Sequence, residues 1–147
     1  MIYQLFVIED QPAIRAVYRH YIARESNLQI VGEAMTGKEA LRLLQEHKPD
    51  IILLDLSLPD TSGLELLKIL KQLYPQIPVL VVSGQDETIY GPLALKAGAS
   101  GYVEKSHVIG VLPQAISKIV SGLHHWSSGV IDRANGQGTQ GKLPQSR

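Results

Sequence analysis

The chain has 147 residues, with 14 basic and 14 acidic side chains and therefore a formal net charge of zero. A hydrophobic content of 44% is that of a globular protein and excludes disorder of the whole chain, and the length predicts one domain. The chain contains no cysteine, which excludes disulfides, thiolate metal sites and cysteine nucleophiles. Because no apolar run reaches about 18 residues and acidic residues follow the first apolar run, we expect a soluble, cytoplasmic protein with no membrane partner.

Residues 1–126 alternate between two hydrophobic periods. Short apolar runs rich in β-branched residues predict strands, and several are apolar almost throughout, as expected of parallel strands covered on both faces. Helical patterns lie between them, and Thr36 with Glu39 and Ser62 with Glu65 are candidate capping boxes for two of the helices. The predicted strands are residues 2–8, 28–34, 51–54, 79–83 and 101–103. Five strands alternating with helices predict an α/β fold, a doubly wound parallel sheet with helices on both faces.

Two prolines fall within predicted helices. Pro113 is compatible with the last helix only in the first turn, where its missing N–H has no partner to lose, so we expect that helix to begin near Gly110. Proline also disfavours helical geometry in the residue before it, which here is Gly91. We therefore expect the fourth helix to begin near Pro92 and residues 85–91 to form a mobile loop.

The composition changes after Trp126. The apolar residues in positions 127–147 are Val130, Ile131, Ala134 and Leu143. Such a stretch cannot offset its ordering entropy by burial, so we expect a folded domain over residues 1–126 and a flexible linker over residues 127–147. The first region holds 11 basic and 13 acidic residues, and the second holds three and one, so the neutral total combines an acidic domain with a basic tail.

Polar residues follow four of the predicted strands. Glu9 and Asp10 follow the first strand, Asp55 the third, Ser83 ends the fourth, and Lys105 follows the fifth. Ligand sites in parallel sheets form at the carboxyl ends of the strands. Three carboxylates at one edge need a compensating cation, and oxygen ligands suit Mg²⁺. The pattern predicts a carboxylate that becomes phosphorylated, with Asp55 as the nucleophile and with Mg²⁺ and Lys105 neutralising the transferred group.

Four sequence motifs occur in order at these strand ends: residues 7–11 (VIEDQ), 52–63 (ILLDLSLPDTSG), 82–84 (VSG) and 97–106 (AGASGYVEKS). Together they resemble the receiver domain of two-component response regulators, over residues 1 to about 124. The run at residues 101–106 is most similar to regulators of the LuxR/NarL type. The resemblance implies a flavodoxin-like (βα)5 sheet with strand order 2-1-3-4-5.

The resemblance also implies roles for the polar residues. Asp55 accepts a phosphoryl group from a sensor histidine kinase or a small phosphodonor, and Lys105 contacts that group. Glu9, Asp10, Asp55 and the backbone carbonyl of Ser57 bind Mg²⁺. The acidic pair is Glu-Asp rather than the commoner Asp-Asp, so the longer Glu9 reaches the metal directly or through water.

Further roles concern the response to phosphorylation. Ser83 bonds a phosphoryl oxygen and its loop follows, while Tyr102 turns inward into the space that the loop vacates. Ser57 and Gln85 stand where side chains tune hydrolysis of the aspartyl phosphate. Gly84 leaves access to Asp55, where a large side chain would block it.

The function expected from the resemblance is a phosphorylation-controlled switch, not an enzyme beyond its own phosphorylation and dephosphorylation. It implies a homodimer and control of transcription through a DNA-binding output domain absent from this chain. Two alternatives share the fold: a stand-alone single-domain regulator, and a pseudo-receiver that acts as an interaction module. An aspartyl-phosphate phosphatase would need a second acid two residues after Asp55, where Ser57 stands.

Overall fold

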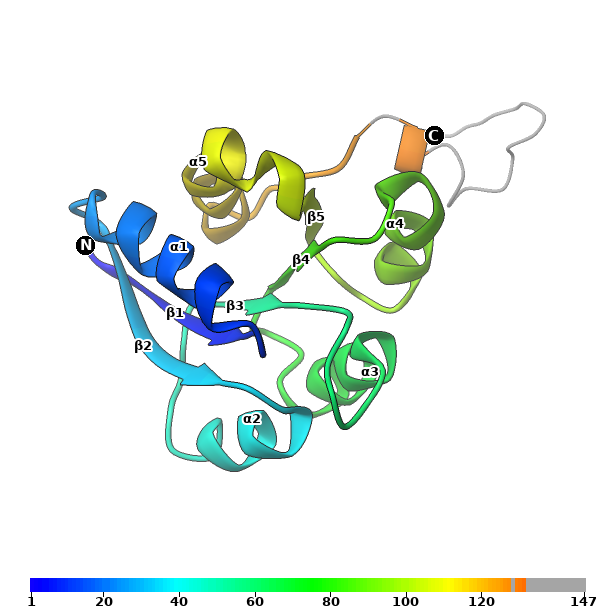
Figure 1. Ribbon diagram of the computed structural model, residues 1–147, viewed down its shortest axis with the longest axis horizontal. Coiled ribbons are helices and arrows are strands. Elements are labelled where there is room, and N and C mark those ends of the chain that lie inside the picture. The colour runs from blue at the N-terminus through cyan, green and yellow to red at the C-terminus, as the bar shows by residue number, and fades with distance from the viewer. Residues whose placement is uncertain (128, 132–147) are drawn as a thin grey trace.

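The sheet consists of five parallel strands in the order β2-β1-β3-β4-β5, as predicted (Figure 1). The structure is a computed structural model and describes residues 1–127 and 129–131. Each strand lies within one residue of its predicted bounds. The strands are β1 (Tyr3–Ile8), β2 (Leu28–Ala34), β3 (Ile51–Leu54), β4 (Val79–Ser83) and β5 (Gly101–Glu104). All residues of β3 and β4 are buried, which is the environment that their uninterrupted apolar runs predict.

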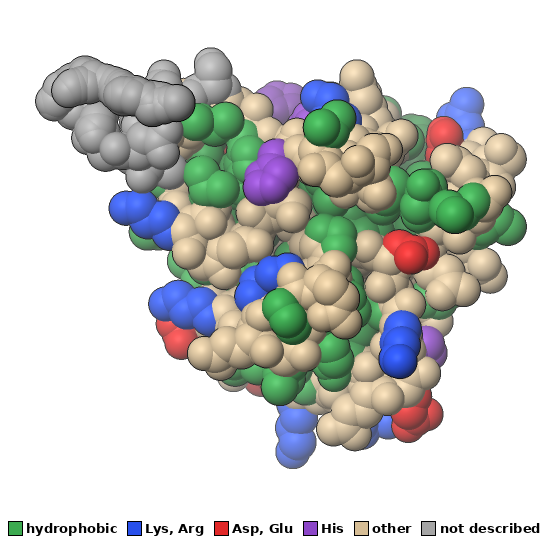
Figure 2. All heavy atoms as spheres, turned by 180° about the vertical axis from the view of Figure 1, so that it is seen from behind, with side chains coloured by type: hydrophobic (Ala, Val, Ile, Leu, Met, Phe, Trp, Pro, Cys, Tyr) green, Lys and Arg blue, Asp and Glu red, His purple; other side chains and the backbone are tan. Residues whose placement is uncertain are grey.

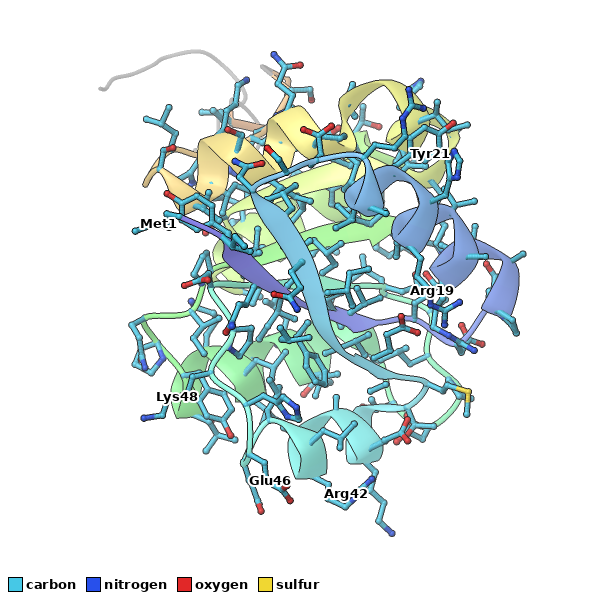
Figure 3. All side chains as sticks on the ribbon, turned by 90° about the vertical axis from the view of Figure 1, so that its left-hand side faces the viewer. Met1, Arg19, Tyr21, Arg42, Glu46 and Lys48 are labelled. Atoms are coloured by element: carbon cyan, nitrogen blue, oxygen red, sulfur yellow. The ribbon has the colours of Figure 1, made fainter. Side chains whose placement is uncertain are left out.

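Helices cover both faces of the sheet (Figure 1). The helices are α1 (Pro12–Ala23), α2 (Gly37–Leu43), α3 (Gly63–Leu73), α4 (Glu87–Lys96) and α5 (Val108–Val120), with a 3-10 turn, η1 (Lys105–His107), before α5. One apolar cluster joins α1 and α5 to the sheet, and a second joins α2, α3 and α4 to the opposite face. At the edge of the sheet, Arg19 of α1 donates two hydrogen bonds to the Glu33 carboxylate of β2 at 2.8 and 2.5 Å (Figure 3).

The two candidate capping boxes have different outcomes. At α2, the Glu39 N–H donates to Thr36 Oγ1 (3.0 Å), while the Glu39 carboxylate accepts from the Met35 N–H (2.8 Å), one residue before the expected partner. At α3, Ser62 makes no side-chain capping bond, and Glu65 instead pairs with Lys68 at 3.4 Å. The predicted capping box at α3 is therefore wrong, because Glu65 pairs with Lys68, one turn later, and not with the start of the helix.

The predicted start of the fourth helix is wrong. Helix α4 begins at Glu87, and Pro92 lies inside it. Asp86 caps the helix, since its carboxylate accepts from the Thr88 N–H (2.9 Å) and its carbonyl accepts from the Tyr90 N–H (2.9 Å). These bonds establish the first turn before the proline is reached, and Pro92 removes only one later bond of the ladder. Residues 87–91 are accordingly helical and not a loop.

The last helix also begins earlier than predicted. It starts at Val108 and not near Gly110, so Pro113 is its sixth residue. The η1 turn leads directly into α5, and burial of Val108 and Leu112 against the sheet fixes this first turn. Burial of the apolar face outweighs the single hydrogen bond that Pro113 lacks.

The chain continues past α5 along β5. His125 forms an isolated parallel bridge with Gly101, and Val130 is fully buried. The expected linker over residues 127–147 lies mainly outside the described residues. In the part of the chain that the structure describes, no helix combines the length and apolar character needed to cross a membrane.

Candidate functional site

Three carboxylates meet at the carboxyl ends of β1 and β3. The two strands are neighbours, with Ile8 paired to Leu54, so the residues that follow them lie side by side. Ligating oxygens of Glu9, Asp10 and Asp55 all lie within 4.8 Å of one another. Glu9 is 0% and Asp55 2% exposed, so this cluster of like charges is largely withdrawn from water. The predicted convergence of acids is present in the structure.

Lys105 supplies a positive charge to this cluster. It follows β5, and its Nζ lies 3.0 Å from Glu9 Oε1 and 3.2 Å from Asp55 Oδ2. Its Nζ also donates to Gln11 Oε1 (3.2 Å). The sequence analysis did not single out Gln11 for this role; the only signal is its position directly after the acidic pair.

The pKa of Glu9 is raised, chiefly because the side chain is buried. The nearby charge of Asp55 raises it further. The Gln11 N–H, which donates to Glu9 Oε2 (3.0 Å), and Lys105 act in the opposite direction without cancelling the rise. Burial also raises the pKa of Tyr18, and the charges of Glu9 and Asp55 add to that rise. One ammonium group therefore does not balance the three carboxylates.

The donor set fits Mg²⁺. Glu9 Oε1 is buried and accepts no hydrogen bond; the Lys105 ammonium lies 3.0 Å from it but donates to the other oxygen, Oε2 (3.3 Å). A buried oxygen in this state, beside two other carboxylates, suits a hard cation that prefers oxygen ligands. The Ser57 backbone lies beside the cluster, since its N–H donates to Asp55 Oδ1 (3.2 Å).

Two contacts shape the loop between β3 and α3. A Cβ on Gly63 would lie 2.3 Å from the Leu56 Cα, so only glycine allows this approach, and the Gly63 N–H donates to the Leu56 carbonyl (3.0 Å). Further along, the Asp60 carboxylate accepts from the N–H groups of Gly37 (2.8 Å) and Lys38 (3.0 Å), which lowers the pKa of Asp60. The loop that carries Ser57 is thereby joined to the start of α2, a role of Asp60 that the sequence analysis missed.

Ser83, Gln85 and Ser57 form a chain of contacts beside Asp55. Ser83 is fully buried, and its Oγ accepts from the Gln85 N–H (3.1 Å). The Gln85 side chain in turn donates to Ser57 Oγ (3.4 Å). The two residues assigned to tuning of hydrolysis are therefore in contact with each other. A Cβ on the intervening Gly84 would meet no atom within 4 Å, so a side chain there would occupy open space.

Tyr102 is joined to the same loop. Its side chain is 1% exposed, and its hydroxyl donates to the Gln85 carbonyl (2.8 Å). Burial raises the pKa of Tyr102 to about 12; an interaction with the Ser83 side chain partly opposes the rise, and the charges of Glu104, Glu87 and Asp86 add to it. The structure therefore places the Tyr102 ring inside the protein and against the loop that follows Ser83.

Comparison with known proteins gives consistent matches. The model of the response regulator receiver domain matches residues 5–117. A putative transcriptional regulator of Pseudomonas aeruginosa is 34% identical over 134 residues, which are 91% of this chain and 64% of the relative. The transcriptional regulatory protein DegU of Brevibacillus brevis is 33% identical over 119 residues, covering 81% of this chain and 50% of DegU. The chain thus spans about half to two thirds of these relatives.

A solved structure agrees with the sequence matches. The crystal structure of a LuxR-family two-component response regulator from Aurantimonas superposes with a TM-score of 0.83 at 32% identity, covering 92% of this chain and 96% of that one. The family match, the strand order and the acidic cluster with its lysine all lead to one assignment. The chain belongs to the response regulator receiver domain family and resembles the receivers of LuxR-type transcriptional regulators.

Proposed function

We propose that Asp55 accepts a phosphoryl group in a Mg²⁺-dependent reaction and that the receiver switches conformation in response. The observation that carries this proposal is the pairing of buried Asp55 with Lys105 inside a cluster of three carboxylates. Family membership supports the donor class, a histidine kinase, and a small phosphodonor such as acetyl phosphate offers the same chemistry. Receivers are generally phosphoacceptor switches, and we propose no other catalysis for this chain.

In the transfer step, a carboxylate oxygen of Asp55 forms a bond to phosphorus. The bond between phosphorus and the donor histidine nitrogen breaks, and its electron pair stays on that nitrogen. Glu9, Asp10, Asp55 and the Ser57 carbonyl would hold Mg²⁺, and the ion would supply positive charge to neutralise the phosphoryl oxygens. Lys105, whose Nζ lies 3.2 Å from Asp55 Oδ2, adds a second positive charge beside the carboxylate.

The switch proposed here runs through Ser83 and Gln85. Ser83 Oγ already accepts from the Gln85 N–H, and the Gln85 carbonyl accepts from the Tyr102 hydroxyl. A Ser83 hydroxyl that turns to bond a phosphoryl oxygen changes the first contact, so residues 84–86 follow it. The contact between the Gln85 and Ser57 side chains supports the proposal that both control the approach of a hydrolytic water.

We infer that the output is control of transcription. The matched relatives are named as transcriptional regulators, and the chain covers only part of each. On the face seen in Figure 2, lysine and arginine side chains are scattered among other types rather than gathered into one basic surface. We propose that DNA binding belongs to an output domain of the regulator rather than to the receiver. We further propose that the regulator acts as a dimer and in the cytoplasm, where response regulators generally act. A stand-alone regulator remains the alternative.

Binding of beryllofluoride, a mimic of the phosphoryl group, tests this proposal. With Mg²⁺ present, fluorine NMR should show a bound resonance, and the amide signals of Ser83, Tyr102 and Lys105 should shift. Asp55→Asn should abolish the bound fluorine resonance and the shifts that beryllofluoride causes, while the amide signals near Glu9 and Asp10 should still shift when Mg²⁺ alone is added. If the unsubstituted protein binds neither Mg²⁺ nor beryllofluoride, the domain is a pseudo-receiver and the proposal is wrong.

A further inference from the structure

The chain that follows α5 returns along the free edge of β5 toward α4 (Figure 1). We call residues 124–127 and 129–131 the docking segment. Its first attachment is a strand-like pairing, in which the His125 N–H donates to the Ser100 carbonyl and the His125 carbonyl accepts from the Tyr102 N–H, both at 3.0 Å. The docking segment therefore occupies the open backbone edge of the sheet.

A second set of attachments joins the docking segment to α4. The Ser127 N–H donates to Glu87 Oε2 (2.9 Å), and Val130 is fully buried. Trp126 packs against the apolar cluster that contains Tyr102 and the buried face of α4. The segment is thus attached to two elements of the fold and not to one.

Two glycines are fitted to the docking segment. A Cβ on Gly91 of α4 would lie 2.8 and 3.1 Å from the two methyl groups of Val130. A Cβ on Gly101 of β5 would lie 2.7 Å from the His125 carbonyl oxygen. Each distance is shorter than van der Waals contact allows, so the surface under the segment admits it only because both positions lack a side chain. Glycine is otherwise unfavourable within a helix, and the close approach of Val130 explains why position 91 lacks a side chain.

Tyr102 connects the docking segment to the loop beside Asp55. Its backbone N–H donates to His125, and its hydroxyl donates to the Gln85 carbonyl. Glu87 makes a second connection, because its carboxylate accepts from Ser127 while its own N–H donates to the Glu104 carboxylate (2.8 Å). A movement of residues 84–87 would therefore disturb both the pairing of His125 with β5 and the contact of Ser127 with α4.

We propose that the docking segment is a clasp, attached to β5 and α4, that is released by phosphorylation of Asp55. This inference rests on the proposed function. The observed attachments are made while Ser83 Oγ accepts from Gln85, and a Ser83 that turns to a phosphoryl oxygen displaces Gln85, to which Tyr102 is bonded. Because coupling between two sites is reciprocal, a detached clasp must also favour occupation of the phosphoryl site.

The single tryptophan of the chain, Trp126, lies in the clasp and reports its position. Addition of Mg²⁺ and beryllofluoride should increase quenching of Trp126 by acrylamide. Hydrogen exchange of the Tyr102 and His125 amides, which make the strand-like pairing, should become faster. Fluorine NMR on the same samples measures beryllofluoride binding without reference to the clasp.

Three variants separate the effect of the clasp from the general effect of substituting a residue in a helix. Gly91→Ala should displace Val130, and Val130→Ala should remove the methyl groups that Gly91 accommodates, so each should increase Trp126 quenching before any ligand is added. Both should bind beryllofluoride about fivefold more tightly, the lower end of typical coupling. Gly110→Ala is the matched control, because this glycine is also helical and a Cβ there would meet nothing within 4 Å.

The outcomes distinguish the two proposals. Bound beryllofluoride with unchanged Trp126 quenching and amide exchange would overturn the clasp and leave the proposed function intact. Unchanged or weaker beryllofluoride binding in Gly91→Ala and Val130→Ala, relative to Gly110→Ala, would also overturn it. No bound fluorine resonance in the unsubstituted protein would overturn the proposed function and the release mechanism together.

Discussion

The ammonium group of Lys105 lies 3.2 Å from Asp55 Oδ2, although the two residues follow strands, β5 and β3, that are separated by β4. The same ammonium lies 3.0 Å from Glu9 Oε1, so one cation serves two buried carboxylates. Because one ammonium group is shared in this way, the cluster keeps a net negative charge until a second cation binds. Carboxylates that are placed close together in order to bind a cation destabilise the folded protein when the cation is not bound.

Glu9→Gln is therefore expected to stabilise the metal-free protein. The raised pKa of Glu9 means that its ionised form is disfavoured in the fold, and glutamine keeps the shape without the charge. We expect the free energy of unfolding in EDTA at pH 7.5 to rise by about 0.5–2 kcal/mol, and Mg²⁺ binding to weaken. Urea denaturation and Mg²⁺ titration measure the two effects. Glu46→Gln, at an exposed site, is the control, and a loss of stability in Glu9→Gln would contradict this account of the charges.

Asp60→Ala should loosen the loop that carries Ser57. The substitution leaves the N–H groups of Gly37 and Lys38 without their acceptor, as in removal of a helix cap. We expect a loss of about 1 kcal/mol in the free energy of unfolding and faster hydrogen exchange at those two amides. Asp60→Asn retains an acceptor oxygen and should fall between the two proteins. Equal stability of all three proteins would show that the hydrogen bonds from Gly37 and Lys38 to Asp60 do not stabilise the fold.

Acid should weaken the pairing between the docking segment and β5. Burial lowers the pKa of His125, as does Lys118 of α5, while Glu87 of α4 partly opposes them, and His125 Nδ1 has no hydrogen-bond partner. Protonation therefore costs more in the docked state than in a released segment, whose histidine titrates near 6.5. Docking is at full strength above pH 6.5 and declines as the pH falls below it. The amide shift of Tyr102 should follow this transition, and the same transition in His125→Gln would contradict it.

The strands could be predicted because they depend on local sequence, and the convergence of the acidic residues because it follows from the order of the strands. Apolar runs identify β3 and β4, and the polar residue after each strand falls at the same edge by topology alone, which brings Asp55 toward Glu9. The start of α4 could not be predicted from Pro92, because a rule about one residue was outweighed by the Asp86 cap and by burial of the helix.

Contacts between loops escaped prediction for a different reason. Asp60 and Gly37 are 23 residues apart, and no periodicity relates them. The docking of Val130 depends on a missing side chain at Gly91, whereas composition records only that residues 127–147 contain few apolar groups. Such complementarity is a property of two surfaces and becomes visible only when both are in place.

Phosphoryl uptake at Asp55 tests the central claim most directly. The protein is incubated with acetyl phosphate with and without Mg²⁺, its intact mass is measured, and the modified peptide is mapped. We predict the addition of one phosphoryl group, dependent on Mg²⁺, on the peptide that contains Asp55, and none in Asp55→Asn or in the presence of EDTA. Failure of the unsubstituted protein to gain this mass, or an equal gain in Asp55→Asn, would contradict the assignment of Asp55 as the phosphoacceptor.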